Sequence, residues 1–301
     1  MANAAPRRAL PPWLKIRPPS GPNVERLRAA SRSRGLATVC EEARCPNLSE
    51  CWGGGTATFM VMGATCTRGC RFCSVATAAR PLAPDPDEPS KLAQTLSEMS
   101  IDYAVVTTVC RDDLPDQGAA HLAACIREVK KVCPKMKLEI LLQDFRGNER
   151  HLETVMNAGA DVHAHNLECV ERLTPTVRDA KAGYRQSLDV LAFAKAKHPE
   201  SPTKTSLMLG LGETKTELIQ AFKDIRSVGT DILTLGQYLR PTGSGHHLPV
   251  ADFVTPEQFD AYGDIARGMG FLYVASGPFV RSSYRAAELF MTGQLESKNA
   301  P

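Results

Sequence analysis

The sequence predicts an α/β fold, namely a partial (β/α)6 TIM-like barrel with an extension at each end. Runs of β-branched and aliphatic residues alternate with amphipathic segments of about 10–15 residues, which indicates βα units and a parallel sheet. Six main units run from residue 57 to about 235, and a final αβ piece follows. Six units are too few to close an eight-stranded barrel, so we expect an open one.

The individual elements follow from hydrophobic periodicity and turn residues. Strands are predicted at residues 56–62, 103–108, 138–142, 161–165, 204–209, 231–235 and 271–275. Helices are predicted near residues 24–35, 90–99, 117–132, 148–158, 183–197, 214–228 and 256–269. Asn23 is suited to cap the first helix and Gly35 to end it. Proline and glycine around residues 40–55 predict a loop there.

The composition is ordinary for a globular protein, with 301 residues, 43% hydrophobic and 23% charged. A net charge of +3 does not indicate nucleic-acid binding, and no apolar run reaches the ~20 residues that span a membrane. The N-terminus has no apolar segment typical of a secretory signal. We therefore expect a cytoplasmic protein; a mitochondrial or plastid protein with a minimal leader is the alternative.

Six of the ten cysteines form two triplets within residues 40–73. Because a reducing compartment disfavours disulfides, this density indicates metal binding or catalysis. The first triplet is Cys40, Cys45 and Cys51, and the second is Cys66, Cys70 and Cys73. Three cysteines do not complete a tetrahedral metal site. Each triplet therefore needs a further partner from elsewhere.

The second triplet has the spacing C-x3-C-x2-C and follows the first predicted strand of the barrel. Iron–sulfur clusters are usually held by four cysteine thiolates, so three would leave one iron of a [4Fe–4S] cluster open to a small chelating molecule. A zinc loop or structural cysteines are the alternatives. Gly63 and Gly69 would let the backbone wrap closely, and Phe72 could shield the cluster from water.

This spacing, placed after the first strand of a parallel βα chain, resembles the radical S-adenosylmethionine (radical SAM) superfamily. The resemblance implies that the open iron chelates the amino and carboxylate groups of SAM. It also implies reductive cleavage of SAM to methionine and a 5′-deoxyadenosyl radical.

The first triplet lies in the phrase CEEARCPNLSECW, which is similar to the signature of the lipoyl synthase family. The similarity extends over nearly the whole chain. Matching phrases are PPWLK at 11–15, RDDLPD at 111–116, DFRG at 144–147, HNLE at 165–168, LMLGLGET at 207–214, TLGQYLRPT at 234–242 and GPFVRSSYRA at 277–286.

The resemblance implies a second, auxiliary [4Fe–4S] cluster held by Cys40, Cys45, Cys51 and a serine of RSSY, which is Ser283 here. An alkoxide is a poorly matched donor to iron, which suits a cluster that is dismantled to supply sulfur. From the residues alone, a cap or turn hydroxyl would be the simpler reading of Ser283. To reach the first triplet, the segment carrying Ser283 must close over the barrel mouth.

The implied reaction inserts two sulfur atoms, at C6 and C8 of an octanoyl group on a lysine of a lipoyl carrier domain. Implied carriers are acyltransferase subunits of 2-oxoacid dehydrogenases and the glycine-cleavage carrier protein. An electron donor such as ferredoxin or flavodoxin and an iron–sulfur carrier protein are implied as further partners. The expected division is an N-terminal extension at 1–56, the barrel at 57–275 and a C-terminal segment at 276–301.

Polar residues near strand ends are candidates for contacting SAM, because they can pair with its carboxylate, amino and ribose groups. The candidates are Thr107, Thr108, Glu139, His165, Asn166 and Arg178. Hydrogen bonding within the scaffold is the alternative for each. The other four cysteines, Cys110, Cys125, Cys133 and Cys169, share no spacing and are assigned to structure. Cys110 stands where the family usually carries Asp.

Two rival functions remain. Another sulfur-inserting radical SAM enzyme, such as a biotin synthase or a methylthiotransferase, would lack the CEEARCPNLSEC and RSSY phrases. An iron–sulfur electron carrier or scaffold would need neither a long βα body nor an open cluster site.

Overall fold

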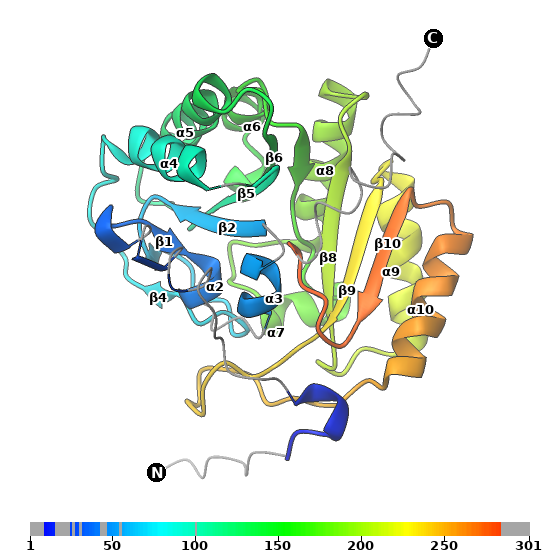
Figure 1. Ribbon diagram of the computed structural model, residues 1–301. Helices are drawn as coiled ribbons and strands as arrows, with labels where there is room; N and C mark the ends of the chain where they lie inside the picture. Colours follow the sequence, from blue (N-terminus) through cyan, green and yellow to red (C-terminus); the bar gives the residue numbers. More distant parts are fainter. Residues whose placement is uncertain are drawn as a thin grey trace.

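The computed structural model describes residues 9–15, 25, 28–29, 32–42, 47–53, 56–99 and 101–283. Its main feature is an eight-stranded sheet in the order β1-β2-β5-β6-β7-β8-β9-β10. Every neighbouring pair is parallel except β1 with β2, which is antiparallel. The sheet curls into an open barrel (Figure 1).

The predicted partial barrel is confirmed. The strands are β1 Ala37–Thr38, β2 Thr56–Val61, β5 Tyr103–Thr108, β6 Lys137–Leu141, β7 Val162–Ala164, β8 Thr203–Leu209, β9 Ile232–Gln237 and β10 Tyr273–Gly277. Strands β2 and β5–β9 belong to the six predicted units, and β10 adds the final parallel strand. Within the described residues no pairing joins β1 to β10, so the sheet stays open.

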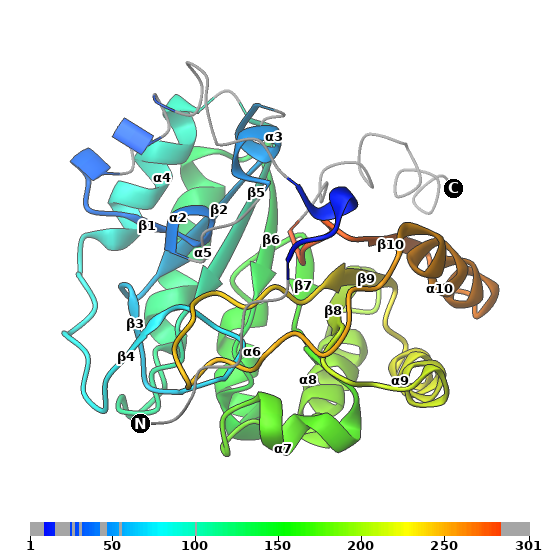
Figure 2. The same ribbon diagram turned by 90° about the horizontal axis from the view of Figure 1, so that it is seen from below.

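Helices lie outside the strands (Figures 1 and 2). The longer ones are α4 Glu88–Glu98, α5 Ala119–Val132, α6 Glu149–Met156, α8 Tyr184–Lys197, α9 Lys215–Ser227 and α10 Pro256–Gly268. Both α9 and α10 begin with a capping box, Thr214 with Glu217 and Thr255 with Gln258, which fixes where each helix starts. No helix in the described part of the chain is long and apolar enough to cross a bilayer.

Short elements connect the main ones. They are η1 Pro12–Leu14, α2 Val39–Glu42, α3 Leu48–Gly53, β3 Thr65–Cys66, β4 Ala76–Thr77, η2 Phe145–Gly147, η3 Glu171–Leu173 and α7 Thr174–Val177. The predicted helix at 24–35 falls partly outside the described residues; of its described positions, 25, 28–29 and 32–33 are helical and 34–35 form a turn.

The prediction of a loop around the first triplet was wrong. Cys40 lies in α2 and Cys51 in α3. The Thr38 hydroxyl accepts a hydrogen bond from the Glu41 N–H, which caps α2. Leu48 and Trp52 are buried in the main hydrophobic core, so tertiary packing stabilises helices too short to be stable alone.

The core has two main parts, one on each half of the sheet. One lies between the first strands and α4–α6, and it includes the buried residues of α2 and α3. The other lies between the later strands and α8–α10. Because α2 and α3 pack into the first part, Cys40 and Cys51 are fixed to the same body as the second triplet.

Candidate functional site

A cavity of about 800 Å³ opens at the carboxyl ends of the strands. Thr107 and Thr108 at the end of β5, and Gly236 and Gln237 at the end of β9, are among its lining residues. The carboxyl edge of a parallel barrel is where catalytic residues gather. The sequence-predicted cluster residues that line the cavity are Cys40, Cys51, Cys66, Cys70, Cys73 and Ser283. Cys45 lies outside the described residues.

The second triplet lies on the segment that begins with β3, just after β2. Backbone N–H groups point at its sulfur atoms: those of Arg68 and Cys110 donate to Cys66 Sγ at 3.4 and 3.3 Å, and that of Asp179 donates to Cys70 Sγ at 3.3 Å. Such donors favour a thiolate, which is the form that binds metal.

The three thiols differ in their pKa. The pKa of Cys66 is lowered to about 6. The largest cause is a hydrogen bond with the Cys110 thiol, and the backbone amides of Arg68 and Cys110 contribute less; burial acts in the opposite direction. Burial raises the pKa of Cys70 to about 11 and that of Cys73 to about 12. A bound metal would reverse the latter two, because a coordinated thiol is deprotonated.

The C-terminal segment after β10 crosses the cavity toward the first triplet. It passes beside α3 (Figure 1), where the Asn47 side chain at the start of that helix donates a hydrogen bond to the Phe279 carbonyl. A Cβ on Gly236 would lie 2.0 Å from the Val280 carbonyl oxygen, so glycine lets the segment pass this close to β9. These contacts bring Ser283 to the same cavity as Cys40 and Cys51.

Five of the six candidates for SAM contact line the cavity, namely Thr107, Thr108, His165, Asn166 and Arg178. Asn166 Oδ1 and Arg178 Nε are buried and have no hydrogen-bond partner in the described part of the chain. Buried polar atoms are normally paired, so these two are available to a bound polar molecule.

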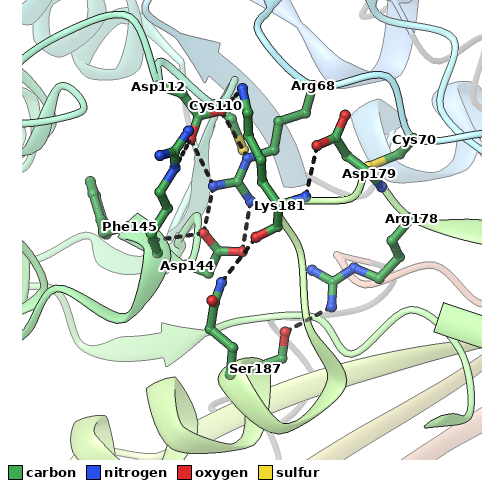
Figure 3. A network of polar contacts seen from close by, with 12 residues as sticks. Arg68, Cys70, Cys110, Asp112, Asp144, Phe145, Arg178, Asp179, Lys181 and Ser187 are labelled. Atoms are coloured by element: carbon green, nitrogen blue, oxygen red, sulfur yellow. Dashed lines mark hydrogen bonds and ion pairs between the residues drawn. The ribbon is translucent and has the colours of Figure 1, made fainter. Parts of the chain in front are cut away.

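His165 has both ring nitrogens engaged, by the Leu142 carbonyl and the Ser187 hydroxyl, each at 2.9 Å. Arg178 Nη1 also donates to the Ser187 hydroxyl, at 2.7 Å (Figure 3). Burial, followed by the charge of Arg178, lowers the pKa of His165 to about 4. At neutral pH the imidazole is therefore uncharged and serves to orient Ser187 and Arg178.

The structure places Glu139 apart from the other candidates. It is not among the cavity-lining residues, and it is 1% exposed. Lys204 Nζ donates to both carboxylate oxygens at 3.0 and 2.8 Å, and the Tyr103 hydroxyl donates at 2.7 Å. A carboxylate with these three bonds is largely satisfied within the protein.

Sequence reasoning did not single out Glu168, and it assigned to structure a cysteine, Cys110, that lines the cavity. Glu168 lines the cavity with a φ of 70°, unusual for a residue other than glycine, and such backbone strain clusters at functional sites. Only its place in the HNLE phrase could have signalled it. Cys110 lines the cavity against Cys66, whereas the buried Cys125 and Cys169 fit the structural assignment.

The residues present fit iron–sulfur clusters. Cysteine thiolates are soft ligands that suit such clusters, and the cavity is of a size typical for cofactor sites. The described cysteines lie in two groups on separate elements around the cavity. The unpaired atoms of Asn166 and Arg178 line the same cavity and can bind a polar small molecule beside the clusters.

Comparisons with known proteins agree with this arrangement. The family model described as the radical SAM superfamily matches residues 60–225, and the model for the N-terminal domain of lipoyl synthase matches residues 2–45.

Curated relatives match over nearly the whole chain. The chain is 58% identical to the lipoyl synthase of Myxococcus xanthus (strain DK1622), over 95% of each protein. It is 56% identical to that of Anaeromyxobacter dehalogenans (strain 2CP-C), over 97% of this chain and 98% of the relative. It is 54% identical to the mitochondrial lipoyl synthase of Culex quinquefasciatus, over 98% of this chain and 78% of the relative.

Solved structures support the fold. Methylornithine synthase superposes with a TM-score of 0.55 at 13% identity, over 93% of this chain and 92% of that one. The hydrogenase maturase HydG superposes with a TM-score of 0.58 at 14% identity, over 72% of this chain and 50% of that one. From its family models, its relatives and its open barrel, the chain belongs to the lipoyl synthase family of the radical SAM superfamily.

Proposed function

We propose that this protein inserts two sulfur atoms, at C6 and C8 of an octanoyl group carried on a lysine of a lipoyl carrier domain. The observation that carries the proposal is that described residues of both cysteine triplets and Ser283 line one cavity. Breaking two unactivated C–H bonds is beyond side-chain acids and bases, so bound cofactors must supply that chemistry.

The two cysteine groups have different tasks in this proposal. Cys66, Cys70 and Cys73 hold the [4Fe–4S] cluster that binds SAM. Cys40, Cys45, Cys51 and Ser283 hold the auxiliary cluster. When bound, the first cluster with SAM supplies the hydrogen-abstracting power and the second supplies sulfur. Ser283, as a hard oxygen donor to iron, makes the auxiliary site easier to open than four thiolates would.

The polar cavity residues orient SAM. Arg178 can pair with its carboxylate, and Asn166 and Glu168 can bond its amino or hydroxyl groups, since their polar atoms line the cavity. Thr107 and Thr108 lie beside them with hydroxyls that already donate to backbone carbonyls, so they can still accept a hydrogen bond. We propose that Glu139 instead stabilises the barrel interior through Lys204.

Apolar side chains on the remaining cavity wall suit an eight-carbon acyl chain. They include Met60, Phe72, Leu207, Met208, Val250 and Phe253. Burying each CH₂ group contributes about 0.8 kcal/mol, so the chain length itself provides substantial binding energy. The same wall excludes water from reactive intermediates.

The partners follow from the reaction. We propose that the substrate is an octanoylated carrier, either an acyltransferase subunit of a 2-oxoacid dehydrogenase or the glycine-cleavage carrier protein. A ferredoxin or flavodoxin would supply electrons and an iron–sulfur carrier protein would rebuild the auxiliary cluster. The bacterial relatives favour a cytoplasmic setting and the relatives named mitochondrial favour the organelle as the alternative.

Anaerobic reconstitution with iron and sulfide tests the proposal. We expect about eight irons per chain, as two four-iron clusters require. On reduction, SAM should be cleaved and an octanoyl-lysine peptide should gain two sulfurs. Binding of one cluster only, or no SAM cleavage, would overturn the proposal. In Ser283→Ala we expect SAM cleavage to continue and sulfur insertion to stop; unchanged product would refute the role of Ser283.

A further inference from the structure

A buried arginine lies inside the second cysteine triplet. Arg68, between Cys66 and Cys70, has a side chain that is 3% exposed. It donates to both oxygens of Asp112 at 3.0 Å each, from Nε and Nη2. It also donates to both oxygens of Asp144, from Nη1 at 2.6 Å and from Nη2 at 2.7 Å. Two bidentate pairs therefore use four of the five guanidinium N–H donors (Figure 3).

The two carboxylates belong to different strand ends and are themselves fixed. Asp112 follows β5, and its side chain also accepts from the Thr67 hydroxyl at 2.8 Å and from Arg146 Nε at 3.0 Å. Asp144 follows β6 and caps η2 by accepting from the Arg146 N–H at 2.9 Å. Their side chains are 3% and 1% exposed, so neither can exchange its partner for water without a larger rearrangement.

The next residue of the loop is held from a third direction. The Gly69 N–H donates to the Asp179 carboxylate at 2.9 Å, and the Asp179 N–H donates to Cys70 Sγ at 3.3 Å. Asp179 follows α7, beyond the next strand of the barrel (Figure 3). The short stretch between Cys66 and Cys70 is thus tied to segments that follow β5, β6 and α7.

This arrangement connects two sequence phrases that the proposed reaction does not itself use. Asp112 belongs to RDDLPD, and Asp144 and Arg146 belong to DFRG. Both phrases meet at Arg68, at the wall of the cavity that Arg68 and Asp144 line. Arg68, Arg146 and Lys181 lie around two carboxylates, with Lys181 Nζ 3.5 Å from Asp112. Arg68 therefore has both of its bidentate partners inside the protein and needs no bound ligand to pair with.

We propose that Arg68 is the positioning residue of the second triplet, holding Cys66 and Cys70 at a fixed separation before metal binds. It acts through the cysteines: Arg68 lines the cavity, but four of its five N–H donors are already used by Asp112 and Asp144. Only a planar guanidinium can pair with two carboxylates bidentately at once; a lysine would keep the charge but lose that geometry. The inference rests on the proposed function only in naming an iron–sulfur cluster as the group that the triplet binds.

Metal release measures the effect directly. The full chain carrying Cys40→Ser and Cys51→Ser, which removes two ligands of the first triplet, is reconstituted anaerobically and challenged with an iron chelator. Because supporting residues typically affect metal affinity by about 10–100-fold, we expect Arg68→Gln and Arg68→Lys to lose iron at least about tenfold faster. Asp144→Asn, which keeps the Asp112 pair, should give a smaller increase. The electron paramagnetic resonance spectrum of the reduced cluster should broaden in the same order.

Arg71→Gln is the matched control. Arg71 lies in the same loop, between Cys70 and Cys73, and its side chain donates to the His246 carbonyl rather than to a carboxylate. Its iron release should stay within about twofold of the parent, since an exposed contact contributes little. Equal release from the parent and from Arg68→Gln would overturn the proposal. Recovery of the parent rate by Arg68→Lys would also overturn it, because charge rather than geometry would then suffice.

A measurement on the metal-free chain tests the role of Arg68 independently of the proposed function. In the metal-free chain, the rates at which an alkylating reagent modifies Cys66 and Cys70 are measured by peptide mapping. Loss of Arg68 should accelerate both, while the buried Cys125 stays protected as a report on the folded core. If the parent triplet bound only zinc, the proposed function would fail, yet this comparison would still decide the role of Arg68. Unchanged alkylation rates would refute it.

Discussion

The two cysteine triplets are built in opposite ways. The second lies on one short loop, and charged side chains from neighbouring strand ends hold it in place. The described cysteines of the first, Cys40 and Cys51, lie on two short helices, and a hydrogen bond between residues 232 positions apart links α3 to the segment that carries Ser283. In the proposed arrangement the second site is formed by the barrel alone, whereas the first would be complete only when the C-terminal segment carrying Ser283 is docked. Under this proposal, the cluster that is dismantled to supply sulfur would lie at the site that is easier to open.

We expect the largest difference between the two sites when one cysteine thiol is removed from each triplet in turn. Cys66→Ser should abolish both SAM cleavage and sulfur insertion, because no radical can form without the first cluster. Cys40→Ser should abolish sulfur insertion while SAM cleavage continues at a rate close to that of the parent. Quantifying 5′-deoxyadenosine and thiolated peptide in the same reaction checks both. If Cys40→Ser lost SAM cleavage as well, the two sites would not be separable as proposed.

Gly236→Ala should disturb the first site alone. The new methyl group would lie 2.0 Å from the Val280 carbonyl oxygen, so the segment leading to Ser283 must move. Overpacking of this kind typically costs about 1–3 kcal/mol. We expect sulfur insertion to fall by more than about tenfold, as loss of about 1.4 kcal/mol of docking energy implies, while SAM cleavage is retained.

Gly268→Ala is its matched control. Gly268 ends α10 with an ordinary backbone conformation, and nothing lies within 4 Å of the added methyl group. Stability should rise by up to about 0.5–1 kcal/mol with no change in either reaction. A loss of SAM cleavage in Gly236→Ala, but not in this control, would show that the C-terminal segment also supports the second site.

Asn47→Ala should have a smaller effect in the same direction. It removes the hydrogen bond to the Phe279 carbonyl, and Asn47 is 4% exposed, so the carbonyl loses a buried partner. The net loss should be about 1 kcal/mol, or roughly fivefold in the docked population. The ratio of sulfur inserted to SAM cleaved measures it. An unchanged ratio would mean that Asn47 does not contribute to docking.

The same contrast explains what the sequence could predict. Local sequence patterns were sufficient to predict the barrel. The alternation of strand-like and helix-like segments from Tyr103 to Ala275 predicted the ends of each strand to within about two residues. They also predicted that the second triplet lies together, and its three cysteines, which are close in sequence, line the cavity. They failed for α2 and α3, whose helical form depends on burying Leu48 and Trp52 in the core. Tertiary packing of this kind leaves no periodic signal in so short a segment.

Within the site, the negative charge of a glutamate did not predict whether its side chain lines the cavity. Glu139 and Glu168 are both acidic residues near strand ends, yet only Glu168 lines the cavity. Glu139 lies on β6 and Lys204 on β8, with β7 between them, so their pairing depends on strand order and register. Arg68 was overlooked for a similar reason. Its two carboxylate partners lie 44 and 76 residues away, and neither spacing is visible locally.

His163 provides a test of the barrel that leaves both sites untouched. It is 1% exposed in β7 and tilts against His198 at 5.1 Å between ring centroids. Neither ring nitrogen has a partner among the described residues. Burial, followed by the charge of His198, lowers the pKa of His163 to about 4. The unfolded chain would titrate near the usual pKa of about 6.5.

Because the folded pKa lies below the unfolded one, the unfolded state binds more protons between these values, and stability falls as pH drops from about 6.5 to 4. The loss attributable to His163 is on the order of 3 kcal/mol at the acid end. His163→Leu should flatten the pH dependence of the unfolding temperature in this window, with no change in SAM cleavage or sulfur insertion at pH 7.5. An unchanged slope would mean that His163 is solvated or paired in the folded protein. A change in either reaction would show that the outer face of β7 is coupled to the cavity. In that case the two cysteine sites would not be independent of this part of the barrel wall.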